Sequence, residues 1–232
     1  MKAAVITRYG SPDVIKILDA PKPAPAAGEV LIRVHATTVN RTDCGELRPR
    51  IIGRFLYGLR RPRRTIAGMD FAGVIEAVGA EVMSFKPGNR VFGMCPSRSN
   101  GAHAEYICIP ETAPIAMMPA NTRFDEAVGK ASFFQCRKLL KLKGTFMATD
   151  VGPWGQYLPL TIWSSIAKNN RVLIPLPPRG SGPAFVEYLK ARMDAGQFRA
   201  VIDRRYPLDA IADAYRYVET GQKVGIVVID VA

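Results

Sequence analysis

The chain has 232 residues, of which 48% are hydrophobic, and its 32 basic against 20 acidic side chains give a formal net charge of +12. A chain of this length can bury a sizeable core and favours two domains over one. It contains no run of about eighteen apolar residues and no basic segment leading into an apolar one, so we expect a soluble, cytoplasmic protein that does not enter a membrane.

The first half of the chain has the pattern of short β-strands. Apolar and β-branched runs are separated by turns rich in proline, glycine and asparagine. The expected strands cover residues 2–7, 14–18, 29–40, 71–79, 90–94 and 104–109. Strands at this spacing predict a partly open β-barrel.

The pattern changes near Thr122, where amphipathic helical segments begin to alternate with short apolar strands. Helices are expected over residues 132–144, 158–170, 184–197 and 206–217, and strands over 145–149, 171–176 and 224–231. The last helix is expected to open at the Tyr206–Pro207 pair. Such alternation is typical of a parallel α/β layer, so the sequence predicts a mixed α/β protein.

The net positive charge raises the question of a polyanionic partner. The densest basic cluster is formed by Arg60, Arg61, Arg63 and Arg64. No recognition helix, zinc finger or aromatic-interleaved basic strand accompanies it, so we expect a solvated loop and no nucleic-acid partner. A polyanion-binding module remains an alternative, and it would lose affinity steeply with added salt.

The cysteines and histidines lack the spacing of a metal site. The chain has four cysteines and two histidines: Cys44, Cys95, Cys108, Cys136, His35 and His103. The cysteines form no CxxC pair, and two histidines offer few imidazole ligands. We therefore expect no metal.

Five segments of the first half follow one another in a distinctive order. They are GSPDVIKI (10–17), HATTVNRTD (35–43), AGMDFAGVIEAVG (67–79), KPGNRVFG (86–93) and GAHAEYICIP (101–110). In this order they resemble the GroES-like catalytic domain of the medium-chain dehydrogenase/reductase family. The later segments 127–155 and 201–229 are similar to the last strands of that family's nucleotide-binding domain and to its C-terminal return into the catalytic domain. The whole chain resembles a zinc-independent quinone oxidoreductase of this family.

The resemblance implies a GroES-like domain formed by residues 1–122 and 177–232. Residues 123–176 would be a truncated remnant of a doubly wound parallel Rossmann sheet. Between the two matching blocks the family has a strand, a glycine-rich turn, a helix and further βα units, together roughly 100 residues. Here the segment 121–130 runs directly across that gap, with the break between Phe124 and Gly129.

The glycine-rich fingerprint that anchors a dinucleotide is absent from the sequence. Among the 20 glycines only Gly180 and Gly182 have the opening G-x-G spacing, and the position three residues further on is Phe185. The fingerprint normally brings a backbone close to the pyrophosphate and aims a helix N-terminus at it. The NADPH that the resemblance implies therefore loses its main anchor.

Resemblance also indicates which residues would serve the chemistry. The zinc-dependent members of the family carry cysteine, histidine and glutamate where this chain has Asn40, Met69 and Asp70, and these residues cannot replace the zinc ligands. Zinc-independent members reduce quinones or enones with hydride from NADPH and hold the substrate carbonyl with polar groups. By resemblance Asn40 and Asp43 are the catalytic candidates; alternatively, the NRTD segment is only an Asx turn.

Four further residues are candidates for contact with the cofactor. Asp150, Val151 and Gly152 follow an expected strand at its carboxyl end, where open α/β sheets bind ligands. Lys223 matches the family's basic residue before the last strand. The alternatives are a plain loop for the first three residues and a solvated surface position for Lys223.

The missing segment has consequences for assembly and activity. The expected strands 145–149 and 171–176 would lack their inner neighbours, and an isolated two-stranded remnant is marginal, so we expect a homodimer that pairs this edge. Beside the polyanion-binding module, two functions remain open. One is an impaired NADPH-dependent reductase of a quinone or enone; the other is a catalytically inactive binding scaffold or deletion product derived from such a reductase.

Overall fold

The structure is a computed structural model that describes residues 1–49, 54, 58–96, 101–120, 122–127, 145–147, 171–173, 182–197 and 200–231. The chain divides into two units, Met1–Gly129 with Gly182–Ala232, and Lys130–Ser181. In the second unit the described residues form a parallel pair of strands, β8 (Thr145–Met147) and β9 (Arg171–Leu173). The helices expected over residues 132–144 and 158–170 lie outside the described residues.

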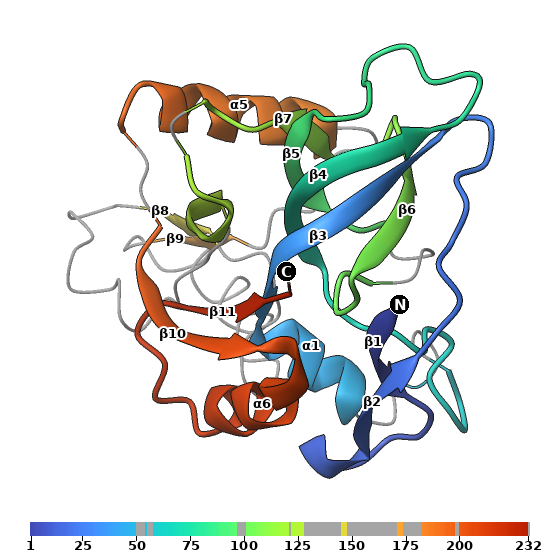
Figure 1. Ribbon diagram of the computed structural model, residues 1–232. Helices are drawn as coiled ribbons and strands as arrows, with labels where there is room; N and C mark the ends of the chain where they lie inside the picture. The colour runs from blue at the N-terminus through green and yellow to red at the C-terminus, as the bar shows by residue number, and fades with distance from the viewer. Residues whose placement is uncertain are drawn as a thin grey trace. The chain divides into compact units, whose positions relative to one another are not determined.

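A seven-stranded sheet forms the body of the first unit (Figure 1). Its strands are β3 (Glu29–Val39), β4 (Asp70–Val78), β5 (Arg90–Met94), β6 (Tyr106–Pro110), β7 (Ile115–Met117), β10 (Ile202–Pro207) and β11 (Ile226–Asp230). The order along the sheet is β10-β11-β3-β4-β5-β7, and β6 also pairs with β3. All pairs are antiparallel except β10 with β11.

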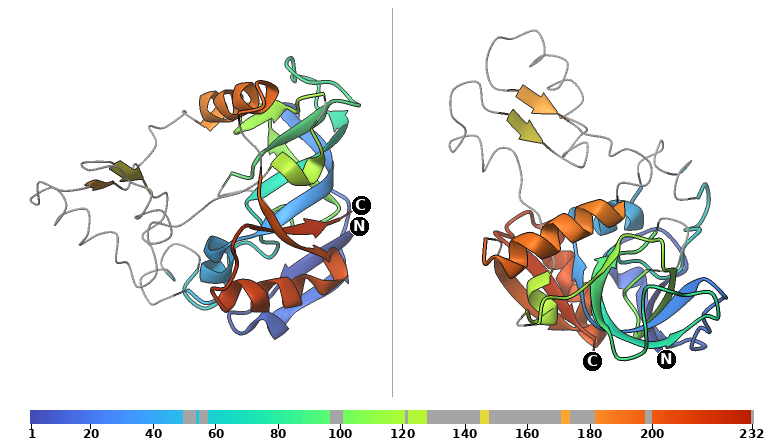
Figure 2. Two further views of the ribbon diagram at one scale, coloured as in Figure 1. Left: turned by 90° about the vertical axis from the view of Figure 1, so that its left-hand side faces the viewer. Right: turned by 90° about the horizontal axis from the view of Figure 1, so that it is seen from above.

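The sheet curls into a partly open barrel, as the two further views show (Figure 2). Within it β3 pairs with β4, β6 and β11. Val30, Ile32 and Val34 of β3 are fully buried in a cluster with Phe71 of β4 and Ile107 of β6. These three alternate along β3 and so share one face of the strand. Burial of such apolar side chains stabilises the barrel and requires β3 to keep its register.

Two strands near the N-terminus and three α-helices complete the described part of the first unit. β1 (Lys2–Ile6) and β2 (Ile15–Asp19) form a separate antiparallel pair. The helices are α1 (Arg41–Leu47), α5 (Gly182–Asp194) and α6 (Ile211–Glu219). None of the helices in the described part of the chain is long and apolar enough to cross a membrane.

One expected boundary is wrong. Tyr206 and Pro207 do not open a helix but end strand β10, and a short 3-10 turn (Leu208–Ala210) follows before α6 begins at Ile211. The parallel pairing of Tyr206 with Ile229 of β11 keeps this segment extended. Pro207 can end the strand because a proline is tolerated where its missing N–H is not required.

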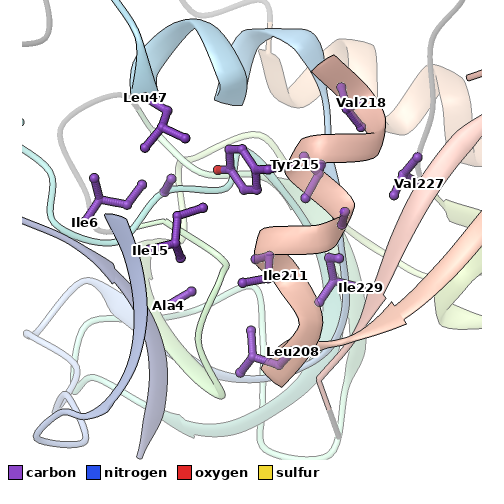
Figure 3. Close-up of a cluster of buried hydrophobic side chains, with 13 residues drawn as sticks. Ala4, Ile6, Ile15, Leu47, Leu208, Ile211, Tyr215, Val218, Val227 and Ile229 are labelled. Carbon is purple, nitrogen blue, oxygen red and sulfur yellow. The ribbon is translucent and has the colours of Figure 1, made fainter. Parts of the chain in front are cut away.

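Helix α6 closes the second large core of this unit (Figure 3). Its buried residues Ile211, Ala214, Tyr215 and Val218 recur at the i, i+3, i+4, i+7 spacing of one helix face. In the close-up Tyr215 points from α6 toward Leu47 of α1. Tyr215 is fully buried, and its hydroxyl lies 3.4 Å from Nδ1 of His103.

Replacement of Tyr215 tests whether α6 is an integral part of this core. We expect Tyr215→Ala to lower the free energy of unfolding by about 3 kcal/mol, because a fully buried aromatic ring is lost and a cavity remains. Tyr188→Ala on α5 is the matched control, since Tyr188 is 54% exposed, and should cost less than about 0.5 kcal/mol. Urea unfolding followed by circular dichroism measures both; equal losses would contradict this packing.

Candidate functional site

The candidate site lies where three segments of the sheet meet. Strand β3 ends at Val39, and Asn40 is the N-cap residue of helix α1. The pairing of Thr37 with Phe71 places Thr38 beside Asp70, the first residue of β4. On the other side of β3, Val227 of β11 pairs with Val39, and Lys223 lies just ahead of this strand. The register of β3 thus brings side chains from distant parts of the sequence together.

The carboxamide of Asn40 is at the centre of this cluster. Its Nδ2 donates to Oγ1 of Thr38 over 2.8 Å and to Oδ2 of Asp70 over 3.0 Å. The Thr38 hydroxyl in turn donates to the same Asp70 oxygen over 3.1 Å. The Asn40 Oδ1 accepts a hydrogen bond from Nζ of Lys223 over 3.2 Å. Asn40 therefore links a buried carboxylate to an ammonium group.

Asp43 stabilises the start of α1. One of its carboxyl oxygens accepts the backbone N–H of Asn40 over 2.7 Å, as an N3 residue does in a capping box. The side chain is fully buried, and its Oδ1 has no hydrogen-bond partner in the described part of the chain. Burial raises the pKa of Asp43 to about 8, against the lowering effect of the Asn40 N–H. The carboxyl group is thus neutral at pH 7.

Lys223 is half-buried beside Asn40. Burial lowers the pKa of Lys223 below its ordinary value, while the nearby Asp43 and Cys44 act in the opposite direction. Its ammonium group has three donors, and one of them is used, on Asn40, in the part of the chain that the structure describes. The cluster therefore retains hydrogen-bonding capacity for a ligand.

His103 supports the cluster from within the core. It is fully buried, with Nε2 3.0 Å from the carbonyl oxygen of Thr38. Burial lowers its pKa to about 4, so the ring is neutral at pH 7. Gly68, with φ of 98°, lies against this ring, and a Cβ there would approach His103 Cδ2 to 2.5 Å. His103 is a packed core residue that contacts the backbone of β3 near the end of the strand.

Two family models cover most of the chain. One, described as "Alcohol dehydrogenase GroES-like domain", matches residues 26–120, and the other, described as "Zinc-binding dehydrogenase", matches residues 124–229. The chain belongs to the medium-chain dehydrogenase/reductase family.

Similar family members include reductases of two kinds. The quinone oxidoreductase of Sus scrofa is 34% identical over 143 residues, which are 60% of this chain and 41% of that protein. The 2-methylene-furan-3-one reductase of Solanum lycopersicum is 25% identical over 311 residues, covering 99% of this chain and 79% of that protein. The chain thus spans about two fifths of the length of the quinone oxidoreductase it matches.

Solved structures of the family share the fold. The quinone oxidoreductase from Coxiella burnetii has a TM-score of 0.68 at 17% identity, with 100% of this chain and 99% of that chain covered. An NAD-dependent alcohol dehydrogenase has a TM-score of 0.70 at 17% identity, with 100% of each chain covered. The mixed α/β fold and the membership of the medium-chain dehydrogenase/reductase family that the sequence predicts are confirmed.

The structure brings three of the predicted site residues together. Asn40, Asp43 and Lys223 lie in one cluster. The other predicted cofactor contacts lie outside the described residues. They are Asp150, Val151 and Gly152. Residues 41–47 form α1 with Asn40 as its N-cap, and Asp43 accepts the backbone N–H of Asn40, so the NRTD segment also satisfies a backbone donor, as the Asx-turn alternative expects.

Sequence reasoning missed Thr38 and Asp70 as members of this site. Asp70 entered only as a residue that cannot replace a zinc ligand, and Thr38 did not enter at all. Both are buried, with exposures of 0% and 8%. A buried aspartate at the first position of a strand needs hydrogen-bond partners for its carboxylate. That requirement is the signal that points to Asp70 and Thr38.

Other polar clusters of the described residues contain ion pairs, and Nε of Arg64 is a buried atom without a hydrogen-bond partner among these residues. Arg64 lies 3.9 Å from Glu46 and donates to the carbonyl of Gly68 over 3.3 Å. A hollow of about 470 Å³ is lined by His35, Ala36, Arg90, Ala120, Thr122, Arg123, Phe124, Asp125, Arg205 and Asp230. There Arg205 forms ion pairs with both Asp125 and Asp230. No group of three or more His, Cys, Asp or Glu is placed to bind a metal ion within the described ranges.

Asp43 should make the stability of the protein depend on pH. Its folded-state pKa is raised, so its contribution is fully present below the ordinary pKa of 3.8 and is lost as pH rises toward about 8. Asp43→Asn keeps an oxygen acceptor for the Asn40 N–H but does not titrate. We expect the variant to gain stability relative to the parent protein by up to about 1.4 kcal/mol per pH unit through this window.

Urea unfolding of both proteins at several pH values between about 5 and about 8 measures the difference directly. Other groups titrate equally in the two proteins, so the comparison isolates Asp43. A difference in stability that stays constant across this range would show that Asp43 is ionised in the folded protein.

Proposed function

We propose that this chain carries the substrate half of a zinc-independent, NADPH-dependent reductase of quinones or enones, located in the cytoplasm, with impaired binding of the cofactor. The Asn40–Lys223 hydrogen bond at the end of β3 is the observation that carries this proposal. It places a cation and a carboxamide at one point, next to a neutral Asp43. Polar groups of this kind can hold a carbonyl oxygen without a metal.

The residues of this chain fit the nicotinamide end of a nicotinamide dinucleotide better than its pyrophosphate. A family of dehydrogenases and reductases implies such a cofactor, and NADPH is the form we propose. Lys223 offers ammonium donors near the expected substrate position. The sequence contains no G-x-G-x-x-G turn to bring a backbone close to a pyrophosphate. The described residues therefore fit the substrate end of the site and supply no pyrophosphate cradle.

The chemistry of the site follows from these residues. When bound, the dinucleotide supplies the hydride. The protein's part is to hold the substrate carbonyl, to orient it and to offset the negative charge that develops on its oxygen. Asn40 and Lys223 together serve the first two tasks, Asn40 through its hydrogen bond to Lys223, and the positive charge of Lys223 serves the third. Asp43 acts on the same site by capping α1 behind Asn40.

Zinc independence is part of the proposal. The zinc-dependent members of the family carry cysteine, histidine and glutamate as zinc ligands. At the matching positions this chain has Asn40, Met69 and Asp70. Asn40 cannot supply a thiolate, and a thioether is a poor replacement for imidazole at zinc. Asp70 also accepts hydrogen bonds from Thr38 and Asn40 through one oxygen.

The proposal assigns residues 1–122 and 177–232 to the GroES-like domain and residues 123–176 to a remnant of the Rossmann domain. The alignment with the tomato reductase supports a missing segment, because its 311 residues exceed the 232 of this chain. The alternative function, an inactive reductase-derived scaffold or a deletion product, rests on the same gap. Cofactor-dependent turnover separates the two.

The function is tested by NADPH oxidation in the presence and absence of 1,4-naphthoquinone. We expect slow oxidation that requires the quinone and rises with NADPH without saturating up to about 1 mM, the upper end of common KM values, because the pyrophosphate anchor is absent. Asn40→Leu should lower the rate at least about tenfold. Fluorescence titration with NADPH runs in parallel. A folded protein with neither NADPH binding nor quinone-dependent oxidation would support the scaffold instead.

We also propose a homodimer that pairs the edge of the β8–β9 strand pair. Two parallel strands alone bury little apolar surface and leave backbone groups to be paired. Size-exclusion chromatography with light scattering should give about twice the 25.4 kDa mass of the chain. A well-folded species of single-chain mass would reject this assembly.

A further inference from the structure

The hydrogen bonds of Asn40 leave it without a free donor. Both hydrogens of a carboxamide nitrogen can be donated, and Asn40 directs Nδ2 at two acceptors, Thr38 Oγ1 and Asp70 Oδ2. Its Oδ1 accepts from Lys223. A carbonyl oxygen that approached Asn40 would have to displace one of these partners.

Thr38 and Asp70 fix which way the carboxamide faces. The single hydroxyl hydrogen of Thr38 is directed at Asp70, so the Thr38 oxygen presents lone pairs to Asn40. A flipped carboxamide would place Oδ1 against the Thr38 and Asp70 oxygens, and it would turn Nδ2 toward the Lys223 ammonium. Both contacts are repulsive, and Thr38 and Asp70 are buried, where such repulsion is weakly screened.

Lys223 is the cation that this orientation holds in place. Its ammonium donates to the Asn40 oxygen and has two further donors. The side chain is half-buried, so a hydrogen bond from it to a ligand oxygen meets less competition from water than one from an exposed lysine.

We propose that Thr38 and Asp70 are positioning residues that fix the carboxamide orientation of Asn40, and that Lys223, held by Asn40, is the hydrogen-bond donor to the substrate carbonyl oxygen. The identity of the substrate rests on the proposed reductase function; the positioning relation among the four side chains does not. Asn40 then acts as the link between the buried carboxylate and the lysine, and its own amide does not contact the substrate.

The positioning relation is tested by the titration of Lys223 itself. Lysines are methylated reductively with ¹³C-formaldehyde, and the Lys223 signal is assigned by its absence in Lys223→Arg. Thr38→Val and Asp70→Leu each remove an acceptor of the Asn40 amide. We expect both to lower the NMR titration midpoint of Lys223 by at least about half a pH unit, because the Asn40 oxygen is then held less firmly against the ammonium.

Thr37→Val is the matched control for a lost buried hydroxyl. Thr37 is also fully buried, and its Oγ1 donates to the backbone carbonyl of Asp70 over 2.7 Å without contact to the Asn40 amide. It should destabilise the protein like Thr38→Val yet leave the Lys223 midpoint unchanged, whereas Thr38→Ser should restore the midpoint. An unchanged Lys223 midpoint in both Thr38→Val and Asp70→Leu would overturn the positioning relation. Two variants are used so that the test still holds if one of them does not fold.

The donor role is tested by Lys223→Met in the quinone assay. A lost hydrogen bond from a charged donor should raise the KM for 1,4-naphthoquinone about tenfold, and at saturating quinone it should leave the slope of the rate against NADPH concentration unchanged. A lower slope against NADPH concentration with an unchanged KM for the quinone would overturn the donor role and assign Lys223 to the cofactor. A shifted midpoint in Thr38→Val without any turnover in the parent protein would support the positioning relation and reject the proposed reductase function.

Discussion

The antiparallel pairing of β3 with both β4 and β11 is the constraint on which the rest of the structure depends. It places Thr38 beside Asp70 on one side and brings Lys223 to Asn40 on the other. Side chains alternate between the faces of a strand, so a slip of one residue against β4 would turn Asp70 away from Asn40. Buried apolar clusters on both sides of β3 hold this register, and the site is a consequence of the core.

The barrel strands could be predicted because they are β-branched runs bounded by turn residues. The expected strand at 29–40 corresponds to β3 (Glu29–Val39), and that at 90–94 to β5 (Arg90–Met94). Prediction failed where a local signal competed with distant pairing. The Tyr206–Pro207 pair has the pattern of a helix start, yet pairing with β11 makes it the end of β10. Such pairing leaves no trace in a short window of sequence.

The site likewise contains residues that the sequence indicates and residues that only the structure brings together. Asn40, Asp43 and Lys223 were found through a family resemblance, and the structure brings them together. Thr38 and Asp70 are 32 residues apart and meet only through strand register, so no motif names them as a pair. Every member of this hydrogen-bond network lies in the first unit. Under the proposed function, a chain without the dinucleotide fingerprint retains the substrate side of a reductase site.

Binding of a quinone in the absence of NADPH tests that claim most directly. Isothermal titration of the protein with 1,4-naphthoquinone should show saturable binding that Lys223→Met weakens about tenfold, because the substrate side is assembled by the barrel itself. Quinone binding that appears only after NADPH is added, or that Lys223→Met leaves unchanged, would contradict it.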